Sequence, residues 1–235
     1  MKRGLACAAL AFLAISPAAF AQRTSVSRDF PIYDNGQKPD LTVDPKRFES
    51  QMEIVDRFFD PDSCALAEHV VGGAGYRRIL RFDTVVINAG GGNLVIGDRS
   101  DPNNPYAQWF EFHPCHGHYH IGDFSVYELL DESGAVVIAG HKQGFCFEDS
   151  LRYGGGKSDG FNCRFQGITS GWGDWYYKQL IGQWIDITGI PEGDYRVRVR
   201  INVPGIFDEG ENRYPNVVET MIHVPDPRNK VDLVD

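Results

Sequence analysis

Short apolar runs, several of them alternating with polar residues, recur along the chain and predict β-strands. The runs span residues 77–88, 93–98, 106–130, 135–139, 144–147, 183–188, 195–203 and 217–224. Segments rich in glycine or in acidic residues separate them, and we expect residues 153–160 and 208–215 to be loops. Many short strands joined by turns predict an all-β single domain. An antiparallel sandwich-like fold or a barrel, with long loops and a few short helical turns, fits this pattern.

Helix signals are few. The pair Asp44-Pro45 predicts the start of a short helix within residues 39–52, because aspartate caps helix N-termini and proline suits the first helical position. Residues 55–75 are ambiguous and are compatible with one short helical turn. We therefore expect the folded domain to occupy residues 39–235, preceded by a flexible lead-in over residues 22–38.

Residues 1–21 have the pattern of a secretory signal peptide. Two basic residues precede an apolar run, and Ala19-Phe20-Ala21 supplies the small residues that signal peptidase requires. The apolar run is too short to cross about 30 Å of hydrocarbon, which disfavours a membrane anchor. Gly4 stands where a lipoprotein signal at Cys7 needs an apolar residue. We expect a secreted or periplasmic protein, cleaved near Ala21 and not inserted in a membrane.

The composition limits the classes of molecule that the protein is expected to bind. The formal net charge is −9, so nucleic acids and acidic membrane surfaces are poor partners. Hydrophobic residues make up 42% of the chain, as in an ordinary folded globule. After the signal peptide, the four remaining cysteines are Cys64, Cys115, Cys146 and Cys163. In an oxidising compartment an even number favours disulfides, but spacing leaves three pairings open, and so does one bridge with two free thiols.

The strongest chemical signal is a group of four histidines within eight residues. His116, His118 and His120 alternate, so they would share one face of a strand, and His113 precedes them. In a straight strand His116 and His120 would lie about 13 Å apart, four steps of roughly 3.3 Å, so the chain must bend to bring the rings together. Gly117 makes such a bend inexpensive. Exposed surface histidines are the bland alternative, but three in alternation favour a metal site for copper or zinc.

Three motifs around these histidines resemble the catalytic domain of the lysyl oxidases. Residues 109–120 read WFEFHPCHGHYH, against the family's W-x-W-H-x-C-H-x-H-Y-H, and residues 123–131 continue the match. Residues 140–149 read GHKQGFCFED, similar to G-H-K-x-x-F-C-L-E-D, and residues 183–188 read QWIDIT, followed by GDY. The motifs stand in the family's order from about residue 39 to residue 224, which is far more specific than any one of them.

The resemblance implies a copper amine oxidase. It places copper on His116, His118 and His120, with His113 outside the ligand set. It also implies a lysyl tyrosylquinone made from one lysine and one tyrosine. These are Lys142, in the G-H-K motif, and Tyr176, with Tyr177 as the alternative one residue away.

The implied reaction converts a primary amine, on peptidyl lysine or a small molecule, to an aldehyde. Molecular oxygen is consumed, and hydrogen peroxide and ammonia are released. The general base of this reaction is open. Asp174, two residues before Tyr176, is one possibility. An ordinary turn aspartate is an equally good interpretation of the same residue.

The resemblance also implies a disulfide and a calcium site. It pairs Cys115 with Cys163, which leaves Cys146 either free or paired with Cys64. Asp40, the Leu41 carbonyl, Glu209, Glu211 and Asn216 resemble the family's calcium ligands, and their oxygen atoms suit a hard cation. Two solvated acidic loops are the alternative interpretation of these five residues.

Two other functions remain open at this stage. A periplasmic copper-binding protein would use the three histidines without forming the quinone. A zinc hydrolase would also suit three histidines, but no motif places a glutamate as its base. The acidic composition favours cationic amines, which fits lysine side chains and polyamines equally well.

Overall fold

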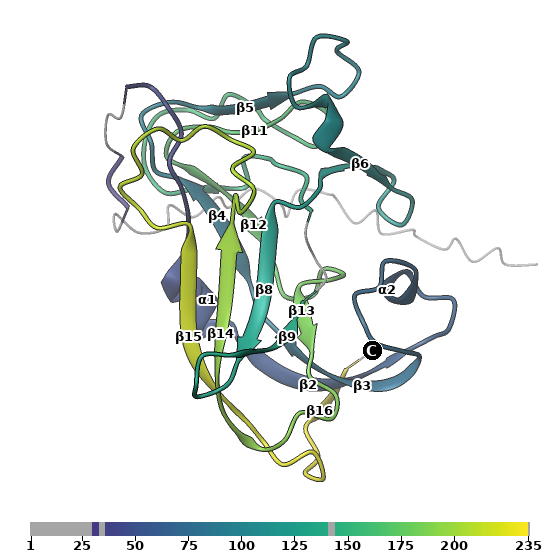
Figure 1. The fold of residues 1–235 in the computed structure, drawn as a ribbon. Helices are drawn as coiled ribbons and strands as arrows, with labels where there is room; N and C mark the ends of the chain where they lie inside the picture. The colour runs from purple at the N-terminus through teal and green to yellow at the C-terminus, as the bar shows by residue number, and fades with distance from the viewer. Residues whose placement is uncertain (1–29, 33–35, 141–143, 235) are drawn as a thin grey trace, which may run out of the picture.

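The computed structural model describes residues 30–32, 36–140 and 144–234. Its elements in chain order are β1 (Leu41–Val43), α1 (Pro45–Ser50), β2 (Glu53–Phe59), α2 (Cys64–Ala67), β3 (Gly75–Arg81), β4 (Thr84–Asn88), β5 (Leu94–Gly97), η1 (Ala107–Trp109), β6 (Phe110–His113), β7 (His118–Ile121), β8 (Ser125–Leu130), β9 (Val136–Ala139), β10 (Leu151–Arg152), β11 (Gln166–Ile168), β12 (Trp172–Tyr176), β13 (Trp184–Asp186), β14 (Gly193–Ile201), β15 (Val217–Val224) and β16 (Asp232–Val234). Strands dominate and the helices are short, which confirms the all-β prediction (Figure 1).

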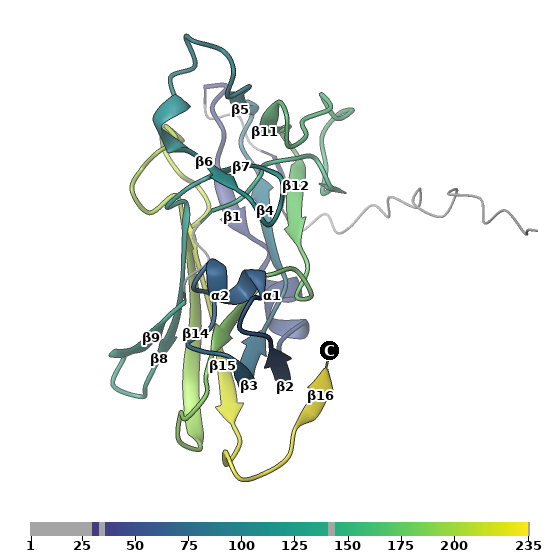
Figure 2. The ribbon, with the colours of Figure 1, turned by 90° about the vertical axis from the view of Figure 1, so that its right-hand side faces the viewer.

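Three four-stranded sheets contain most of the strand residues in the part of the chain that the structure describes. Their strand orders are β1-β4-β12-β10, β13-β3-β2-β16 and β15-β14-β8-β9, and two-stranded ribbons β11-β5 and β6-β7 complete the fold. Pairing is antiparallel throughout these sheets except between β16 and β2, which run parallel. The side view places β15-β14-β8-β9 in one layer, with β4 and β12 in the layer opposite (Figure 2).

The main core lies between these two layers. Val197 and Val199 from β14 are fully buried with Val86 from β4 and with Trp172 and Tyr176 from β12. Alternation along β14 produces this arrangement, because every second side chain points inward. Tyr176 is one of the buried residues of this core, so its side chain lies on the core-facing side of β12.

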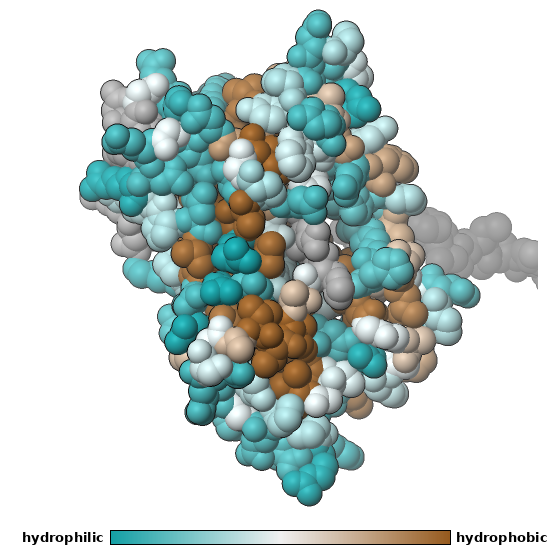
Figure 3. Space-filling model, in the orientation of Figure 1, coloured by the Kyte–Doolittle hydropathy of each residue, from teal (hydrophilic) through white to brown (hydrophobic). Residues whose placement is uncertain are grey.

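The edge strand β9 shows a different pattern. Val136 and Val137 are 46% and 41% exposed, and Figure 3 shows an apolar patch on the surface over β8 and β9. This strand ends at Ala139, two residues before the first residue of the gap at 141–143. Lys142 falls within that gap and so lies outside the described residues.

The predicted helix after Asp44 is confirmed as α1. The Asp44 side chain accepts hydrogen bonds from the backbone N–H groups of Lys46 and Arg47, and Pro45 occupies the first turn. The ambiguous segment 55–75 contains both β2 and a single turn of helix, α2. The predicted signal peptide and most of the lead-in lie outside the described residues.

Besides the run 77–88, which splits into β3 and β4, two of the predicted strands differ from the structure. The long run 106–130 breaks into η1, β6, β7 and β8, because turns interrupt it at residues 114–117 and 122–123. Residues 144–147 form no named strand, although Phe145 makes an isolated bridge to Ile121 at the end of β7. In both places tertiary contacts override the local alternation. Among the described residues, no helix has both the length and the apolar content to cross a membrane.

The disulfide pairing implied by the resemblance is wrong. Cys115 bonds to Cys64, and Cys146 bonds to Cys163. The physical reason lies in the fold: α2 packs beside the turn that carries Cys115, whereas Cys163 faces the segment that carries Cys146. Cys64 and Cys146, whose pairing the sequence left open, are therefore both in disulfides.

Removing the Cys64–Cys115 bridge with a double serine variant should lower the free energy of unfolding by about 2–4 kcal/mol, because the bridge closes a long loop. Urea unfolding measures this loss. The matched variant without Cys146–Cys163 should lose about 1 kcal/mol less, since that bridge spans 17 residues rather than 51. Finding a Cys115–Cys163 peptide in a non-reducing digest would contradict both the pairing and this ranking.

Candidate metal centre and cofactor site

The histidines lie on a hairpin formed by β6 and β7. Residues 114–117 form the turn, and the backbone N–H groups of His116 and Gly117 donate to the His113 carbonyl at 3.0 and 2.9 Å. Gly117 has φ +71°, a left-handed conformation that glycine adopts without steric cost. The expected single strand through all three histidines is therefore wrong at its first member. His116 belongs to the turn, and only His118 and His120 lie on β7.

This turn solves the distance problem of a straight strand. His118 and His120 approach with their Nε2 atoms 3.0 Å apart, and His116 supplies a nitrogen within 4.8 Å of both. His120 is 4% exposed, and the other two are half-buried. Three imidazole nitrogens that converge in this way form a donor set suited to copper or zinc. The bend that the sequence analysis required is thus present, at Gly117.

His113 occupies a different position from the other three. Its ring stacks on His120, with the ring centroids 4.2 Å apart. Within the described chain, the group whose ligand atoms all converge contains His116, His118 and His120 and does not include His113. The placement of His113 outside the ligand set agrees with this geometry.

Glu68 is a site residue that the sequence analysis missed. It follows α2, and its carboxylate lies 3.3 Å from His116 Nε2 and 3.6 Å from His113 Nδ1. The Cys64–Cys115 bridge ties α2 to the tip of the hairpin, which brings the two segments together (Figure 1). The only sequence signal was the spacing of Glu68 from Cys64, and it required the correct disulfide pairing to be useful.

Tyr176 is buried beside the segment that follows Lys142. Its hydroxyl donates to the Cys146 carbonyl at 2.6 Å, and its ring packs on Phe145 with a centroid distance of 4.1 Å. Tyr177, the alternative, follows the end of β12 and is 44% exposed. Of the two tyrosines, only Tyr176 faces the residues near Lys142 in sequence.

Asp174 contacts the same phenol. The Tyr176 hydroxyl donates to Asp174 Oδ2, and so does the backbone N–H of Glu148 at 3.2 Å. Burial raises the pKa of Asp174 well above its ordinary value, and the nearby carboxylates of Glu148 and Asp149 add to the effect. Burial also raises the pKa of Tyr176, with the Asp174 charge as the next cause. The phenol therefore stays protonated at neutral pH, and the aspartate binds protons more readily than an exposed one.

The tyrosine and the histidines are connected through residues 144–146. Phe145 and Ile121 exchange backbone hydrogen bonds of 2.7 and 3.2 Å, which fixes this segment against β7. Gly144 lies so close that a Cβ there would be 3.3 Å from the His120 Cβ. The Cys146 sulfur in turn lies within 4.8 Å of a ring nitrogen of His118. The chain just after Lys142 thus lies between Tyr176 and the candidate metal ligands.

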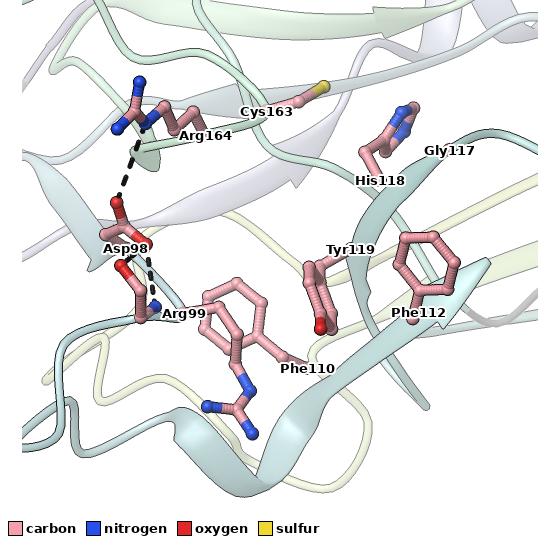
Figure 4. Close-up of a pocket in the computed structure, with 10 residues that line it drawn as sticks. Asp98, Arg99, Phe110, Phe112, Gly117, His118, Tyr119, Cys163 and Arg164 are labelled. Carbon is pink, nitrogen blue, oxygen red and sulfur yellow. Dashed lines mark hydrogen bonds and ion pairs between the residues drawn. The ribbon is translucent and has the colours of Figure 1, made fainter. Parts of the chain in front are cut away.

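A cavity of about 540 Å³ opens beside the hairpin. Figure 4 shows His118 and Cys163 at one end of it, with Phe110, Phe112 and Tyr119 along the hairpin. Its aromatic lining comes from the face of the β6-β7 ribbon opposite His113, His118 and His120, since side chains alternate across a strand, and His118 borders the cavity from the first residue of β7. Asp98 pairs with Arg164 across the far side of this cavity, with N and O 4.0 Å apart. An organic molecule bound here would lie next to His118.

The predicted calcium ligands are brought together in part. Asp40 and Glu209 are buried, and the Leu41 N–H and the Asn216 amide donate to Glu209 at 2.5 and 2.7 Å. One oxygen of Asp40, Oδ1, is buried without a hydrogen-bond partner in the described chain. Burial raises the pKa of Glu209. Glu211 is exposed on the same loop. The unpartnered Asp40 oxygen beside a second buried carboxylate fits a cation.

Comparison with known proteins adds an independent result. The lysyl oxidase family model matches residues 40–230. Human lysyl oxidase homolog 2 is 34% identical over 189 residues, or 76% of this chain and 23% of that protein. Human lysyl oxidase homolog 1 is 34% identical over 214 residues, which are 86% of this chain and 36% of that protein. Lysyl oxidase homolog 2A of Danio rerio is 35% identical over 191 residues, which are 77% of this chain and 25% of that protein. The chain thus spans only about a quarter to a third of the length of these relatives. The motifs, the fold and these matches agree, and the chain belongs to the lysyl oxidase family.

Proposed function

We propose that this protein is a copper-dependent amine oxidase with a lysyl tyrosylquinone formed from Lys142 and Tyr176. Membership of the lysyl oxidase family supports a copper amine oxidase-like function. The observation that carries the finer proposal is the position of Tyr176, which is buried against Phe145 and Cys146. These two residues lie in the segment that pairs with the end of β7, the strand that holds two of the three converging histidines. Lys142 precedes Phe145 by three residues, so the covalent chain keeps it within about 11 Å of Phe145.

The proposal gives each residue of the site a separate task. His116, His118 and His120 hold the copper, and Tyr176 with Lys142 holds the organic group. Copper and the quinone would together supply the redox chemistry by which a primary amine, oxygen and water give an aldehyde, ammonia and hydrogen peroxide. Asp174, whose pKa is raised by burial, would accept a proton in this reaction. The cavity beside His118 binds the body of the amine.

The competing proposal is a copper-binding protein that never forms the quinone. It shares the three histidines, so copper binding alone does not separate the two. Peptide mass spectrometry of the copper-loaded, aerated protein does. We expect a cross-link between the peptides that contain Lys142 and Tyr176, together with staining for quinone. Copper-loaded protein with neither would favour the copper-binding proposal, and a protein that takes up stoichiometric zinc but no copper would favour a hydrolase.

The proposed activity also implies a class of substrate and a compartment. Primary amines, either on lysine-containing proteins or as small molecules, and molecular oxygen are the proposed partners. We propose that the protein works outside the cytoplasm, secreted or periplasmic, after cleavage near Ala21. Two disulfides are consistent with an oxidising compartment.

We also propose a calcium site at Asp40, the Leu41 carbonyl, Glu209, Glu211 and Asn216. Calcium at 100 times its dissociation constant should stabilise the wild type by about 2.7 kcal/mol, because it binds the folded state alone. The Asp40→Asn variant should lose that increment. Asp208→Asn is the matched control, since Asp208 lies on the same loop but pairs with Lys38. Thermal unfolding with and without calcium measures the stabilisation of each variant. A wild type whose melting temperature does not change in millimolar calcium would contradict the site.

A further inference from the structure

Glu68 has an unusual environment for a carboxylate. Its side chain is 16% exposed, and Oε1 is buried without a hydrogen-bond partner in the part of the chain that the structure describes. Within those residues, its ion-pair partners are His113 and His116, and neither a lysine nor an arginine pairs with it. A buried carboxylate costs several kcal/mol unless a positive charge or strong hydrogen bonds offset that cost. Among the described residues only these two imidazoles lie against the carboxylate, and no lysine or arginine offsets its charge.

A cation on the three histidines would supply that missing charge. His116 presents Nε2 to the carboxylate, with both oxygens at 3.3 Å, and a histidine ring has a second nitrogen for a metal. Glu68 itself is not among the residues whose ligand atoms converge within 4.8 Å. Metal-bound histidines commonly donate their other N–H to a carboxylate, which fixes the tautomer and the orientation of the ring. The contacts of Glu68 match that arrangement.

We propose that Glu68 is a positioning residue of the copper centre. Its carboxylate accepts the Nε2–H of His116, leaves Nδ1 of that ring for the metal, and places one negative charge behind the ligand. It also lies 3.6 Å from Nδ1 of His113, whose ring stacks on His120, so it restrains both sides of the histidine group. The role rests on the copper site proposed above, and it extends that site to α2.

The disulfide explains how α2 holds this position. Glu68 caps the C-terminus of α2, where its backbone N–H donates to the Cys64 carbonyl at 2.9 Å. Cys64 is bonded to Cys115, the residue directly before His116. Glu68 and His116 are therefore fixed to the same bridge, one on each side. The bridge thus holds the two backbone segments that carry the 3.3 Å contact next to each other.

The test is Glu68→Gln in the full oxidised chain, because glutamine keeps the size and removes the charge. A chelator competition measures copper affinity, and Cu(II) electron paramagnetic resonance reports the ligand field. We expect affinity to fall about 10- to 100-fold, with one copper still bound at saturation and an altered spectrum. Glu49→Gln is the matched control, since Glu49 is an exposed glutamate on the other short helix, α1. It should change neither quantity.

Stability without metal separates positioning from a merely structural role. Removing a buried charge that lacks a full partner should leave the melting temperature of the copper-free protein unchanged or higher, while the increment on adding copper becomes smaller. A lower melting temperature in the copper-free variant, with unchanged copper affinity, would show that Glu68 only supports the fold. Affinity within twofold of wild type and an identical spectrum would also overturn the proposal.

Two further results identify where a failure lies. Loss of all copper from Glu68→Gln, as expected for His118→Ala, would make Glu68 a direct ligand and would contradict the positioning role. A wild type that binds no copper would remove both the copper site and the role of Glu68. If the wild type binds copper and Glu68→Gln binds it with the same affinity, only the role of Glu68 is contradicted, and the proposed function stands.

Discussion

Replacing Tyr176 with phenylalanine is expected to abolish amine-dependent hydrogen peroxide release from the copper-loaded protein, whereas Tyr177→Phe should retain it. The physical reason is position. The Tyr176 hydroxyl is buried against the Cys146 carbonyl and Asp174, while Tyr177 is 44% exposed. Lys142→Arg should be inactive as well, because arginine lacks the amine that joins the tyrosine ring. A coupled peroxidase assay with several primary amines measures all three variants.

Copper content is the necessary control for this comparison. All three variants should bind one copper, so that loss of activity reports the organic cofactor rather than the metal. The Lys142–Tyr176 cross-linked peptide should be absent from Tyr176→Phe and Lys142→Arg and present in Tyr177→Phe. Activity in Tyr176→Phe with none in Tyr177→Phe would move the assignment by one residue. Copper binding without oxidation of any amine, in wild type and variants alike, would favour the copper-binding alternative.

The second large effect concerns the metal. Alanine at His116, His118 or His120 should abolish stoichiometric copper binding, because each removes one of three converging nitrogens. His113→Ala should reduce binding less, since that ring stacks on His120 and contacts Glu68 but is not one of the three converging ligands. Metal analysis after gel filtration gives the copper content of each variant. Full copper retention by His118→Ala would contradict the assignment, and equal loss in His113→Ala would place that residue among the ligands.

Local signals in the sequence predicted much of the fold. The run 217–224 coincides with β15, and Asp44 caps α1, because alternation and helix capping are decided by neighbours in the chain. The run 77–88 was predicted as one strand but is two, β3 and β4, which lie in different sheets. Where a strand leaves one sheet for another depends on the partners that surround it, and the local pattern contains no information about them.

The candidate site shows the same division. The three histidines were found because their spacing is local, and Gly117 predicted the bend that brings them together. The disulfide pairing was predicted wrongly and Glu68 was missed, because both depend on contacts between segments about 50 residues apart. The two failures are linked: the correct partner of Cys115 would have placed α2, and with it Glu68, beside His116. The structural position of Lys142 stays a prediction.

The parallel pairing of β16 with β2 has a consequence for how this domain acquires its structure. It aligns residues 232–234 with residues 55–57, so it closes a loop of nearly the whole domain. The Leu41–Glu209 contact likewise joins residues 168 positions apart. Loop closure loses chain entropy before any contact compensates for it, and topologies rich in such distant contacts fold slowly. We therefore expect the β16–β2 pairing to form late in folding, after the more local pairings of β2 with β3 and of β14 with β15.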